Sequence, residues 1–465
     1  MTTTMTRGIK ILFMMFTVPC YSGRCQIVLY ASPELCMIAH YACIQTGSCD
    51  SGSLPEAAAG TVIGRTMQGA AVVTEVYDIV VIGAGIHGAG VAQAAAASGH
   101  TVLLIEQTGI AAGTSSRSSK LIHGGLRYLE SMQYRLVRES LRERQLLLKL
   151  APDLVRRVPF YIPVYATTRR RPWQIHAGLS LYALLGGLGA DNLFRRIPLH
   201  DWNNPDGIET RGLQAVFRYF DAQTDDAALT RAVVRSAVTL GARLLLPASF
   251  ISAAVRPDHV VVRYHHNNTD QECQAAVLVN AAGPWVNQVL EAITPSLSRP
   301  SIELVRGTHI RVAGTSAAGN WYMEAPQDGR AVFAMPREGS LLVGTTEAVY
   351  TGDPAAVVPV AEDQRYLLEV LAHYFPYYRD SARSEVLSAY AGVRVLPKGT
   401  GAAFNRPRET IMATDRDITP RVLSIYGGKL TTWRATAAKV MRRIGGGLPV
   451  RSVHADTRTL LLAPD

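Results

Sequence analysis

A regular pattern of apolar and polar positions begins at Tyr77 and predicts a β-α-β unit. Tyr77–Ile82 (YDIVVI) is a short, branched, apolar run typical of a buried parallel strand. A Gly-rich turn leads into an Ala-rich segment, about Ile86–Ser98, which is expected to be helical and to end at Gly99. A second apolar run, Thr101–Ile105, predicts the next buried strand. This order indicates a parallel sheet covered by helices.

Further along the chain, the pattern predicts more helices, a second sheet and a final strand–turn–helix unit. One amphipathic helix has apolar residues at positions 136/137, 141 and 147/148. The predicted helices are Tyr134–Leu150, Asp225–Leu240, Glu362–Tyr374 and Lys429–Ile444. The predicted strands lie within Arg243–Tyr264, Val277–Asn280, Ser301–Gly344 (the second sheet) and Val422–Tyr426.

Three glycines in the first turn form a dinucleotide-binding pattern. Gly83, Gly85 and Gly88 make GxGxxG between a predicted strand and a predicted helix, which is the context that the motif requires. Gly83 permits the tight turn, Gly85 lets the backbone approach a pyrophosphate, and Gly88 lets helix and strand pack closely. Glu106 ends the second strand roughly 20 residues on, where a carboxylate can accept both ribose hydroxyls.

The residues after Glu106 favour FAD over NAD as the bound dinucleotide. An NAD domain would usually continue with regular β/α units, whereas this chain has the polar, donor-rich loop Thr114–Tyr128. Such a loop suits the ribityl chain and ring edge of a flavin. No second strand–GxGxxG–helix unit follows, since Gly187-x-Gly189 lacks the third glycine. NAD is therefore not expected as electron acceptor, which leaves a quinone or oxygen.

Six segments resemble, in order, the FAD-dependent glycerol-3-phosphate dehydrogenases, over nearly all of residues 77–445. They are TSSRSSKLIHGGLRYLE from Thr114, VNAAGPWV (Val279–Val286), VRGTHI (Val305–Ile310), GTTEAVYTGDP (Gly344–Pro354), AGVRVLP (Ala391–Pro397) and YGGKLTTWR (Tyr426–Arg434). The resemblance implies an α/β, D-amino-acid-oxidase-like flavoprotein. It also implies oxidation of sn-glycerol 3-phosphate to dihydroxyacetone phosphate, with electrons passed to a quinone at the membrane.

The predicted fold is a Rossmann-type FAD-binding domain interleaved with an α+β domain. Residues 77–150, 225–300 and 385–445 are assigned to the FAD-binding domain. Residues 151–224 and 301–384 are assigned to a domain that faces the substrate and the membrane, and residues 446–465 to a tail. The C-terminal helical domain that many members of the family carry is expected to be absent, which bears on dimerisation and membrane docking more than on the chemistry.

The motifs supply candidate residues for the cofactor and the substrate. By analogy with the family, Arg127, Arg394 and Lys429 would bind the phosphate or hydroxyl groups, and Tyr128 would donate a hydrogen bond. Arginine forks and a lysine point charge are suited to a phosphate dianion. The residues expected to bind FAD are Gly83, Gly85, Gly88, Glu106, Thr114, Ser115, Ser116, Lys120, Leu121, His123, Gly124, Gly125, Ala282, Gly283, Trp285, Gly427, Gly428, Lys429, Leu430 and Thr431.

Oxidation of a secondary alcohol needs a base for the hydroxyl proton, and two histidines are candidates. We favour His309 in the substrate pocket, acting with Arg394 and Lys429, and place His123 near the flavin. His309 as a core residue is the alternative. His87, inside the glycine motif, stands where the family usually has a smaller polar residue and is interpreted as a tolerated variation. Val395 replaces the proline that commonly follows the motif arginine.

Charge and composition narrow the class of partner. The chain has 465 residues, 48% hydrophobic, and a formal net charge of +10. It has no zinc-ligand spacing and no aromatic–basic RNA motif, so neither a metal nor nucleic acid is expected. The sequence contains no uncharged apolar run of ~18 residues, so no membrane-spanning helix is expected. Arg169–Arg171, Trp173, the apolar stretch Ile175–Leu188 and Arg195–Arg196 resemble an interfacial patch. Peripheral attachment to the cytoplasmic face of the membrane is the prediction; an ordinary amphipathic surface helix is the alternative.

Residues 1–76 differ from the rest of the chain. Arg7 and Lys10 precede the apolar run Ile11–Val18, as at the start of a secretory signal, but no clear cleavage site follows. We expect an upstream extension of the reading frame, with the working protein starting near Met67; a targeting leader is the alternative. Five of the six cysteines lie in this stretch, and only Cys273 lies in residues 77–465. A disulfide framework is therefore not expected there, as in a protein from the reducing cytosol.

Two other functions remain open from the sequence. One is a related FAD-dependent oxidase acting on an amino acid or N-methyl amino acid, with oxygen as acceptor. It would need only one arginine as a carboxylate clamp, so the additional Arg127 and Lys429 favour a phosphate. The other is a non-catalytic flavin-binding protein. A homodimer is possible.

Overall fold

The structure is a computed structural model that describes residues 62–64, 72–204, 206–314, 316–399 and 409–464. The apolar run Ile11–Val18, the proposed start near Met67 and the five N-terminal cysteines lie outside the described residues. Among the helices of the described residues, none is long and apolar enough to cross a lipid bilayer.

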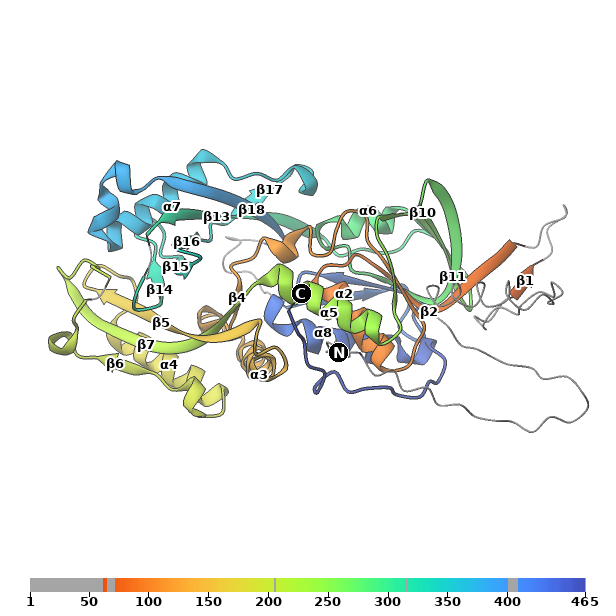
Figure 1. Ribbon diagram of the computed structural model, residues 1–465, viewed down its shortest axis with the longest axis horizontal. Helices are drawn as coiled ribbons and strands as arrows, with labels where there is room; N and C mark the ends of the chain where they lie inside the picture. The colour runs from red at the N-terminus through yellow and green to blue at the C-terminus, as the bar shows by residue number, and fades with distance from the viewer. Residues whose placement is uncertain (1–61, 65–71, 205, 315, 400–408, 465) are drawn as a thin grey trace, which may run out of the picture. The chain divides into compact units, whose positions relative to one another are not determined.

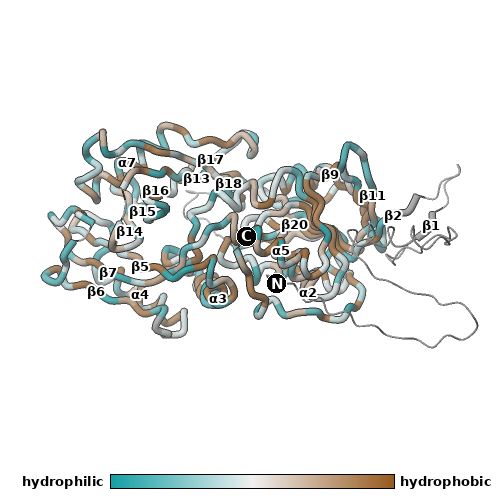
Figure 2. The backbone as a smooth tube through the Cα atoms, in the orientation of Figure 1, coloured by the Kyte–Doolittle hydropathy of each residue, from teal (hydrophilic) through white to brown (hydrophobic). Residues whose placement is uncertain are grey.

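A parallel sheet forms the centre of the first layer. Its central strands pair in the order β8, β3, β2, β11 and β20, all parallel. β11 continues into an antiparallel extension through β10 and β9, and Figure 2 shows hydrophobic colours gathered around β9, β11 and β20. The strands of this sheet are β1 (Val62–Gly64), β2 (Val72–Ile82), β3 (Val102–Ile105), β8 (Arg243–Leu245), β9 (Ala248–Val255), β10 (Val260–His266), β11 (Thr269–Asn280), β12 (Ile293–Thr294), β19 (Ile411–Thr414) and β20 (Val422–Tyr426).

Helices α2 (Ile86–Ala97), α5 (Asp226–Thr239) and α8 (Trp433–Ile444) pack beside one another against this sheet (Figure 1). α2 is buried almost all round, which is consistent with its sequence rich in alanine and glycine. Small side chains let the neighbouring helices approach closely. The short helix α6 (Val286–Glu291) follows β11.

A second sheet is mainly antiparallel, in the order β17-β13-β16-β15-β14-β5-β7-β4. Helix α7 (Ala361–Tyr374) packs on β13–β16, and α3 (Tyr134–Leu150) and α4 (Pro172–Leu185) pack on β5 and β7. The strands of this sheet are β4 (Leu121–Ile122), β5 (Val155–Tyr165), β6 (Arg195–Ile197), β7 (Leu213–Thr224), β13 (Ile302–Ala313), β14 (Asn320–Glu324), β15 (Ala331–Arg337), β16 (Ser340–Gly344), β17 (Ala348–Tyr350) and β18 (Val386–Pro397).

Two differences from the sequence prediction matter for the site. β18 lies in the second sheet, although residues 385–445 were grouped with the FAD-binding segments, because it pairs with β13 from Ile302↔Pro397 to Val312↔Val386. The last helix begins at Trp433 rather than at Lys429, which stands in the turn before it. The division of the chain into domains stays a prediction.

Candidate active site

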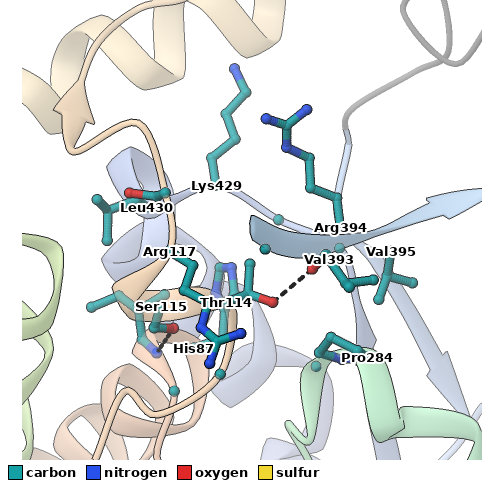
Figure 3. Close-up of a pocket in the computed structure, with 18 of the residues that line it drawn as sticks. His87, Thr114, Ser115, Arg117, Pro284, Val393, Arg394, Val395, Lys429 and Leu430 are labelled. Atoms are coloured by element: carbon teal, nitrogen blue, oxygen red, sulfur yellow. Dashed lines mark hydrogen bonds between the residues drawn. The ribbon is translucent and has the colours of Figure 1, made fainter. Parts of the chain in front are cut away.

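A cavity of about 780 Å³ opens at the carboxyl ends of the central parallel strands, and residues of both sheets line it (Figure 3). Turns after β2, β3, β11 and β20 reach it through Gly83, Glu106, Ala281 and Gly427. This edge is where open parallel sheets bind their ligands. The position of the cavity therefore follows from the order of the strands.

The glycine motif is built from close backbone contacts. Gly83 has φ +97°, and a Cβ on it would lie 2.8 Å from the carbonyl oxygen of Ala281. A Cβ on Gly88 would lie 1.8 Å from the carbonyl oxygen of Gly83. Gly83 and Gly85 line the cavity in front of the N-terminus of α2, whereas Gly88 lies behind them. Free N–H groups at this helix end suit a pyrophosphate.

Glu106 closes the turn after β3 at the same end of the cavity. Its Oε2 accepts a hydrogen bond from the backbone N–H of Ala84 at 2.8 Å, and its Oε1 accepts one from Thr108 at 2.9 Å. The carboxylate is thereby fixed on the cavity wall, in the place expected for a group that binds a ribose.

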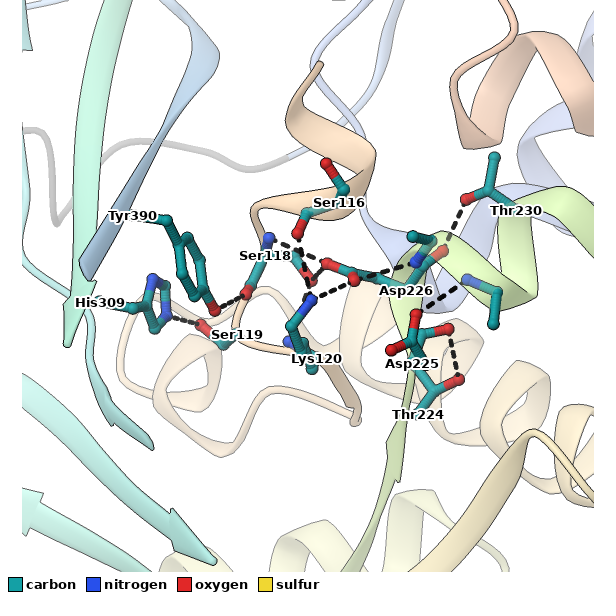
Figure 4. Close-up of polar contacts among 12 residues, drawn as sticks. Ser116, Ser118, Ser119, Lys120, Thr224, Asp225, Asp226, Thr230, His309 and Tyr390 are labelled. Carbon is teal, nitrogen blue, oxygen red and sulfur yellow. Dashed lines mark hydrogen bonds and ion pairs between the residues drawn. The ribbon is translucent and has the colours of Figure 1, made fainter. Parts of the chain in front are cut away.

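The serine-rich loop connects the two sheets across the cavity. The Oγ of Ser115 accepts from the N–H of Ile86 at 2.9 Å, and the Oγ1 of Thr114 donates to the carbonyl oxygen of Val393 at 2.6 Å (Figure 3). Thr114 and Ser115 line the cavity as predicted, but Ser116 and Lys120 do not. Lys120 turns away to pair with the buried Asp226, which also accepts hydrogen bonds from Ser118 (Figure 4).

The turn before α8 brings two glycines and His87 together. Gly428 has φ +103°, and a Cβ on it would lie 2.2 Å from Nε2 of His87. His87 lines the cavity, and its buried Nδ1 has no hydrogen-bond partner among the described residues. Burial lowers the pKa of His87 to about 4, so the ring is neutral near pH 7. His87 is therefore part of the cavity wall rather than a mere variation at a helix start.

Three cations converge on the end of the cavity nearer the second sheet. Arg394 of β18 donates through Nη1 to Oε1 of Glu347 at 2.8 Å, and Nη2 of Arg127 lies 3.6 Å from the same oxygen. Nζ of Lys429 lies 3.9 Å from the centre of the Tyr128 ring. In Figure 3 the Lys429 and Arg394 side chains extend in the same direction from neighbouring segments. The structure thus brings all four predicted substrate groups other than His309 to one wall.

The two candidate histidines occupy different places. His123 lines the cavity, and burial, followed by the charges of Lys429 and Arg127, lowers its pKa to about 3. His309 is 1% exposed and is absent from the residues that line the cavity in the described part of the chain. Its position on β13 places it between β16 and β18, where it stacks on Tyr390 and its Nε2 lies 2.9 Å from the Oγ of Ser119 (Figure 4).

Most of the other predicted cofactor residues line the cavity. They are Leu121, Gly125, Ala282, Gly283, Trp285, Gly427, Gly428, Leu430 and Thr431. Gly124 is buried behind the wall, against Tyr182 and Leu141. Arg117, Ser119 and Phe333 also line the cavity and were not predicted. Arg117 and Ser119 lie in the recognised serine loop, but nothing local in the sequence assigns Phe333 of β15 to the site.

Comparison with known proteins places this geometry in a family. The family model described as FAD dependent oxidoreductase matches residues 78–433. This chain belongs to that family. FAD is therefore its cofactor, and the predicted flavoprotein fold is confirmed. The residues of the cavity wall fit FAD. The buried Nδ1 of His87, which has no partner among the described residues, offers a polar contact. Gly83, Gly85 and Gly428 have no side chains and so leave their backbone accessible along the cavity.

Several members of the family are similar over most of the chain. A D-erythritol 1-phosphate dehydrogenase of Brucella abortus is 36% identical over 379 residues, which cover 80% of this chain and 74% of that protein. A glycerol-3-phosphate dehydrogenase of Pseudomonas aeruginosa is 37% identical over 377 residues, covering 80% and 72%. The structure of the glycerol-3-phosphate dehydrogenase of Bacillus halodurans with FAD superposes with a TM-score of 0.62 at 27% identity, covering 83% and 67%.

Proposed function

We propose that this FAD-dependent oxidoreductase oxidises sn-glycerol 3-phosphate to dihydroxyacetone phosphate and passes the electrons to a quinone. The observation that carries the proposal is the convergence of Arg127, Arg394 and Lys429 beside the flavin-binding end of the cavity. An amino-acid carboxylate needs one arginine, whereas a phosphate dianion is matched by several cations. The two relatives described above, both phosphate-ester dehydrogenases by name, support the same substrate class.

Different side chains of the cavity wall bind the phosphate, contact the hydroxyl groups and accept the proton. Arg127 and Arg394 hold the phosphate, and Glu347, between their forks, fixes their orientation. Lys429 and Tyr128 contact the polyol hydroxyls. His123, neutral at pH 7 and on the wall, takes the proton of the hydroxyl that is oxidised. Bound FAD would supply the acceptor for the hydride that leaves the carbon bearing this hydroxyl. His309, the base favoured from the sequence, is linked to this wall through the contact of its Nε2 with the Oγ of Ser119.

A four-carbon polyol phosphate is the second candidate substrate. The D-erythritol 1-phosphate dehydrogenase of Brucella abortus is 36% identical to this chain, about as similar as the glycerol-3-phosphate dehydrogenases. Both substrates present the same phosphate to the three cations and differ in the length of the carbon chain. Tyr322 and Phe333 line the same cavity, and we propose that they limit the length of the carbon chain.

Anaerobic mixing of the purified flavoprotein with candidate substrates tests the proposal. sn-Glycerol 3-phosphate is expected to bleach the visible absorption of the oxidised flavin, while glycine, sarcosine and D-alanine leave it unchanged. Faster bleaching by D-erythritol 1-phosphate would select the second candidate. Bleaching by an amino acid alone would contradict both, and normal flavin content without bleaching by any of these compounds would indicate a non-catalytic flavin protein.

Peripheral membrane attachment belongs to the same proposal. Trp173 and Leu184 of α4 and Leu188 after it are 70%, 59% and 58% exposed. Arg171, Arg195 and Arg196 are exposed in neighbouring segments. Cations beside exposed apolar side chains suit an anionic bilayer surface, in line with a quinone as acceptor at the cytoplasmic face. Sedimentation with anionic but not zwitterionic vesicles is expected, and should be reduced in Trp173→Ala. The possible homodimer stays a prediction.

A further inference from the structure

A buried ion pair lies behind the segment that carries His123 and Arg127. Arg144 of α3 and Asp221 of β7 pair directly, and their side chains are 1% and 2% exposed. Neither residue is among the cavity-lining residues of the described chain. Charged groups are rarely buried so deeply, because removing two ions from water costs about as much as their attraction returns. The pair is thus weakly explained by stability alone.

Tyr182 of α4 connects this pair to the cavity segment. Its hydroxyl donates to Asp221, with oxygen–oxygen distances of 3.0 Å and 2.9 Å to the two carboxylate oxygens. The same hydroxyl accepts from the backbone N–H of Gly124 at 2.8 Å. Gly124 stands between His123 and Arg127 in the chain. A continuous set of polar contacts therefore runs from the ion pair to the backbone of the substrate segment.

The segment is held closely on both sides. A Cβ on Gly124 would lie 2.5 Å from the Tyr182 hydroxyl, so the backbone has no room to shift toward it. On the other side, the Oγ1 of Thr431 accepts from the N–H of His123 at 3.0 Å. Thr431 belongs to the turn that also carries Lys429. Tyr182 and Thr431 together hold His123 close to the turn that carries Lys429.

The ion pair is itself fixed in position. Arg144 donates to the carbonyl oxygen of Phe220 at 2.9 Å and to the side chain of Asn192. Asn192 in turn donates to the carbonyl oxygen of Gly186 at 2.6 Å. Four separate segments, in α3, β7, α4 and the turn after α4, thus converge on one buried hydroxyl–carboxylate contact. This network restrains the backbone that it contacts, although the buried Nε of Arg144 has no hydrogen-bond partner among the described residues.

We propose that Tyr182, Asp221 and Arg144 are positioning residues, which hold His123 and Arg127 in register for the oxidation of the polyol phosphate. The inference rests on the proposed function, in which His123 takes the proton and Arg127 binds the phosphate. The network touches neither substrate nor cofactor. Its effect on turnover comes through the backbone at Gly124, where a displacement moves the base and the phosphate ligand together.

Tyr182→Phe tests this with the loss of one oxygen atom. The ring that packs on Tyr219 is kept, while Gly124 and Asp221 each lose a partner. We expect normal FAD content, faster amide hydrogen exchange in peptides covering residues 121–128, and a kcat/KM for glycerol 3-phosphate lower by about 10- to 100-fold. Both kcat and KM should change, because His123 and Arg127 move together.

Tyr378→Phe is the matched control. Tyr378 is 6% exposed and its hydroxyl donates to the carbonyl oxygen of Ala313 at 2.9 Å, away from the cavity. The Tyr378→Phe variant should lose about as much unfolding free energy as Tyr182→Phe. Its kcat, KM and amide hydrogen exchange at residues 121–128 should equal those of the wild type. Wild-type exchange and kcat/KM in Tyr182→Phe, or equal slowing in both variants, would overturn the proposal. If the wild type oxidises no polyol phosphate, the proposed function fails, and the exchange comparison still tests the positioning.

Discussion

Single-residue contacts at the nucleotide end leave little freedom for substitution. Gly88 faces the carbonyl oxygen of Gly83, and a Cβ would lie 1.8 Å from it. Gly88→Ala must displace α2 from β2, so we expect a loss of ~3 kcal/mol or more in unfolding free energy and purification largely without FAD. Urea unfolding and the flavin-to-protein absorbance ratio measure both.

Gly178→Ala is the control for this prediction. Gly178 lies inside α4, and a Cβ there meets nothing within 4 Å. Alanine should stabilise that helix slightly, by up to about 1 kcal/mol, because glycine is a poor helix former. Full FAD content in Gly88→Ala would mean that the close approach of helix and strand is not required for binding.

Arg394 is expected to act on substrate binding and not on the cofactor. Arg394→Ala removes one cation from the phosphate wall and with it the ion pair of Arg394 with Glu347. Each charge-assisted hydrogen bond contributes about 1.5–3 kcal/mol, so KM for glycerol 3-phosphate should rise roughly 10- to 100-fold with FAD still bound. Arg443→Ala, at an exposed arginine paired with Asp417, should leave the kinetics unchanged. An unchanged KM in Arg394→Ala would remove this residue from the site.

Residue roles were predictable from the sequence where the contact is local. Gly83, Gly85 and Gly88 act within one turn, so their spacing and context suffice. His309 was placed in the pocket because it lies in a matching motif, but the pairing of β13 with β16 and β18 decides which way its side chain points. Tyr182 and Asp221 approach Gly124 from 58 and nearly 100 positions away, a proximity that no spacing rule reveals.

At the scale of elements, the N-terminus of α5 supports the serine loop. Asp225 caps the helix by accepting from the N–H of Ala228, and the next residue, Asp226, is fully buried and pairs with Lys120. Asp226 also accepts from the N–H and hydroxyl of Ser118, at 3.0 Å and 2.7 Å. The loop that lines the flavin cavity is therefore anchored to a helix by one carboxylate.

Lys120→Met tests this anchor. It leaves the Asp226 charge buried without its cation, so we expect a loss of roughly 3–5 kcal/mol and faster FAD dissociation. Lys439→Met is the control, because Lys439 pairs with Glu139 at the surface, where both side chains are about a third or more exposed. A surface pair contributes at most about 1 kcal/mol. Equal FAD dissociation from the two variants would contradict the anchoring role of Asp226.

Elements with a clear period were predicted closely, and those set by pairing were not. Tyr134–Leu150 and Val422–Tyr426 have the predicted bounds, since the pattern of apolar residues within an amphipathic helix or a short apolar strand is enough to locate its ends. The sequence of β18 gives no information about its partner strand, so the sequence groups it with the FAD-binding segments, whereas the structure pairs it with β13 of the second sheet. The sequence predicts Lys429 inside a helix, but Gly427 and Gly428 turn the backbone through positive φ values before it. Lys429 itself is extended, and its side chain reaches the cavity.

For the whole molecule, the site exists only when both sheets are formed. The flavin end is built from turns of the first sheet, whereas Arg394 and Phe333 belong to strands of the second. The order of the motifs along the chain does not reveal this, because the segments alternate between the sheets. Folding and FAD binding should therefore be coupled. Buried groups that take up protons on unfolding should then lower the free energy of unfolding of the whole holoprotein as the pH falls.

His309 makes that coupling measurable through pH. Burial, followed by the charges of Arg394 and Lys120, lowers its pKa to about 3, while the unfolded chain titrates near the ordinary value of about 6.5. Between these values His309 binds one more proton in the unfolded state, so its contribution to stability is full above pH ~6.5 and falls by about 1.4 kcal/mol per pH unit as the pH drops. In His309→Gln, whose amide can still contact Ser119, the slope between pH 6 and 4 should be smaller by about 1.4 kcal/mol per pH unit, while the buried His87 and His123 keep their shares, although stability at pH 7 falls through lost packing on Tyr390. Urea unfolding of the holoprotein at fixed FAD concentration measures the slope, with His200→Gln, at an 82% exposed side chain, as the control. A slope in His309→Gln equal to that of the wild type would mean that His309 binds its proton in the folded protein as easily as in the unfolded chain.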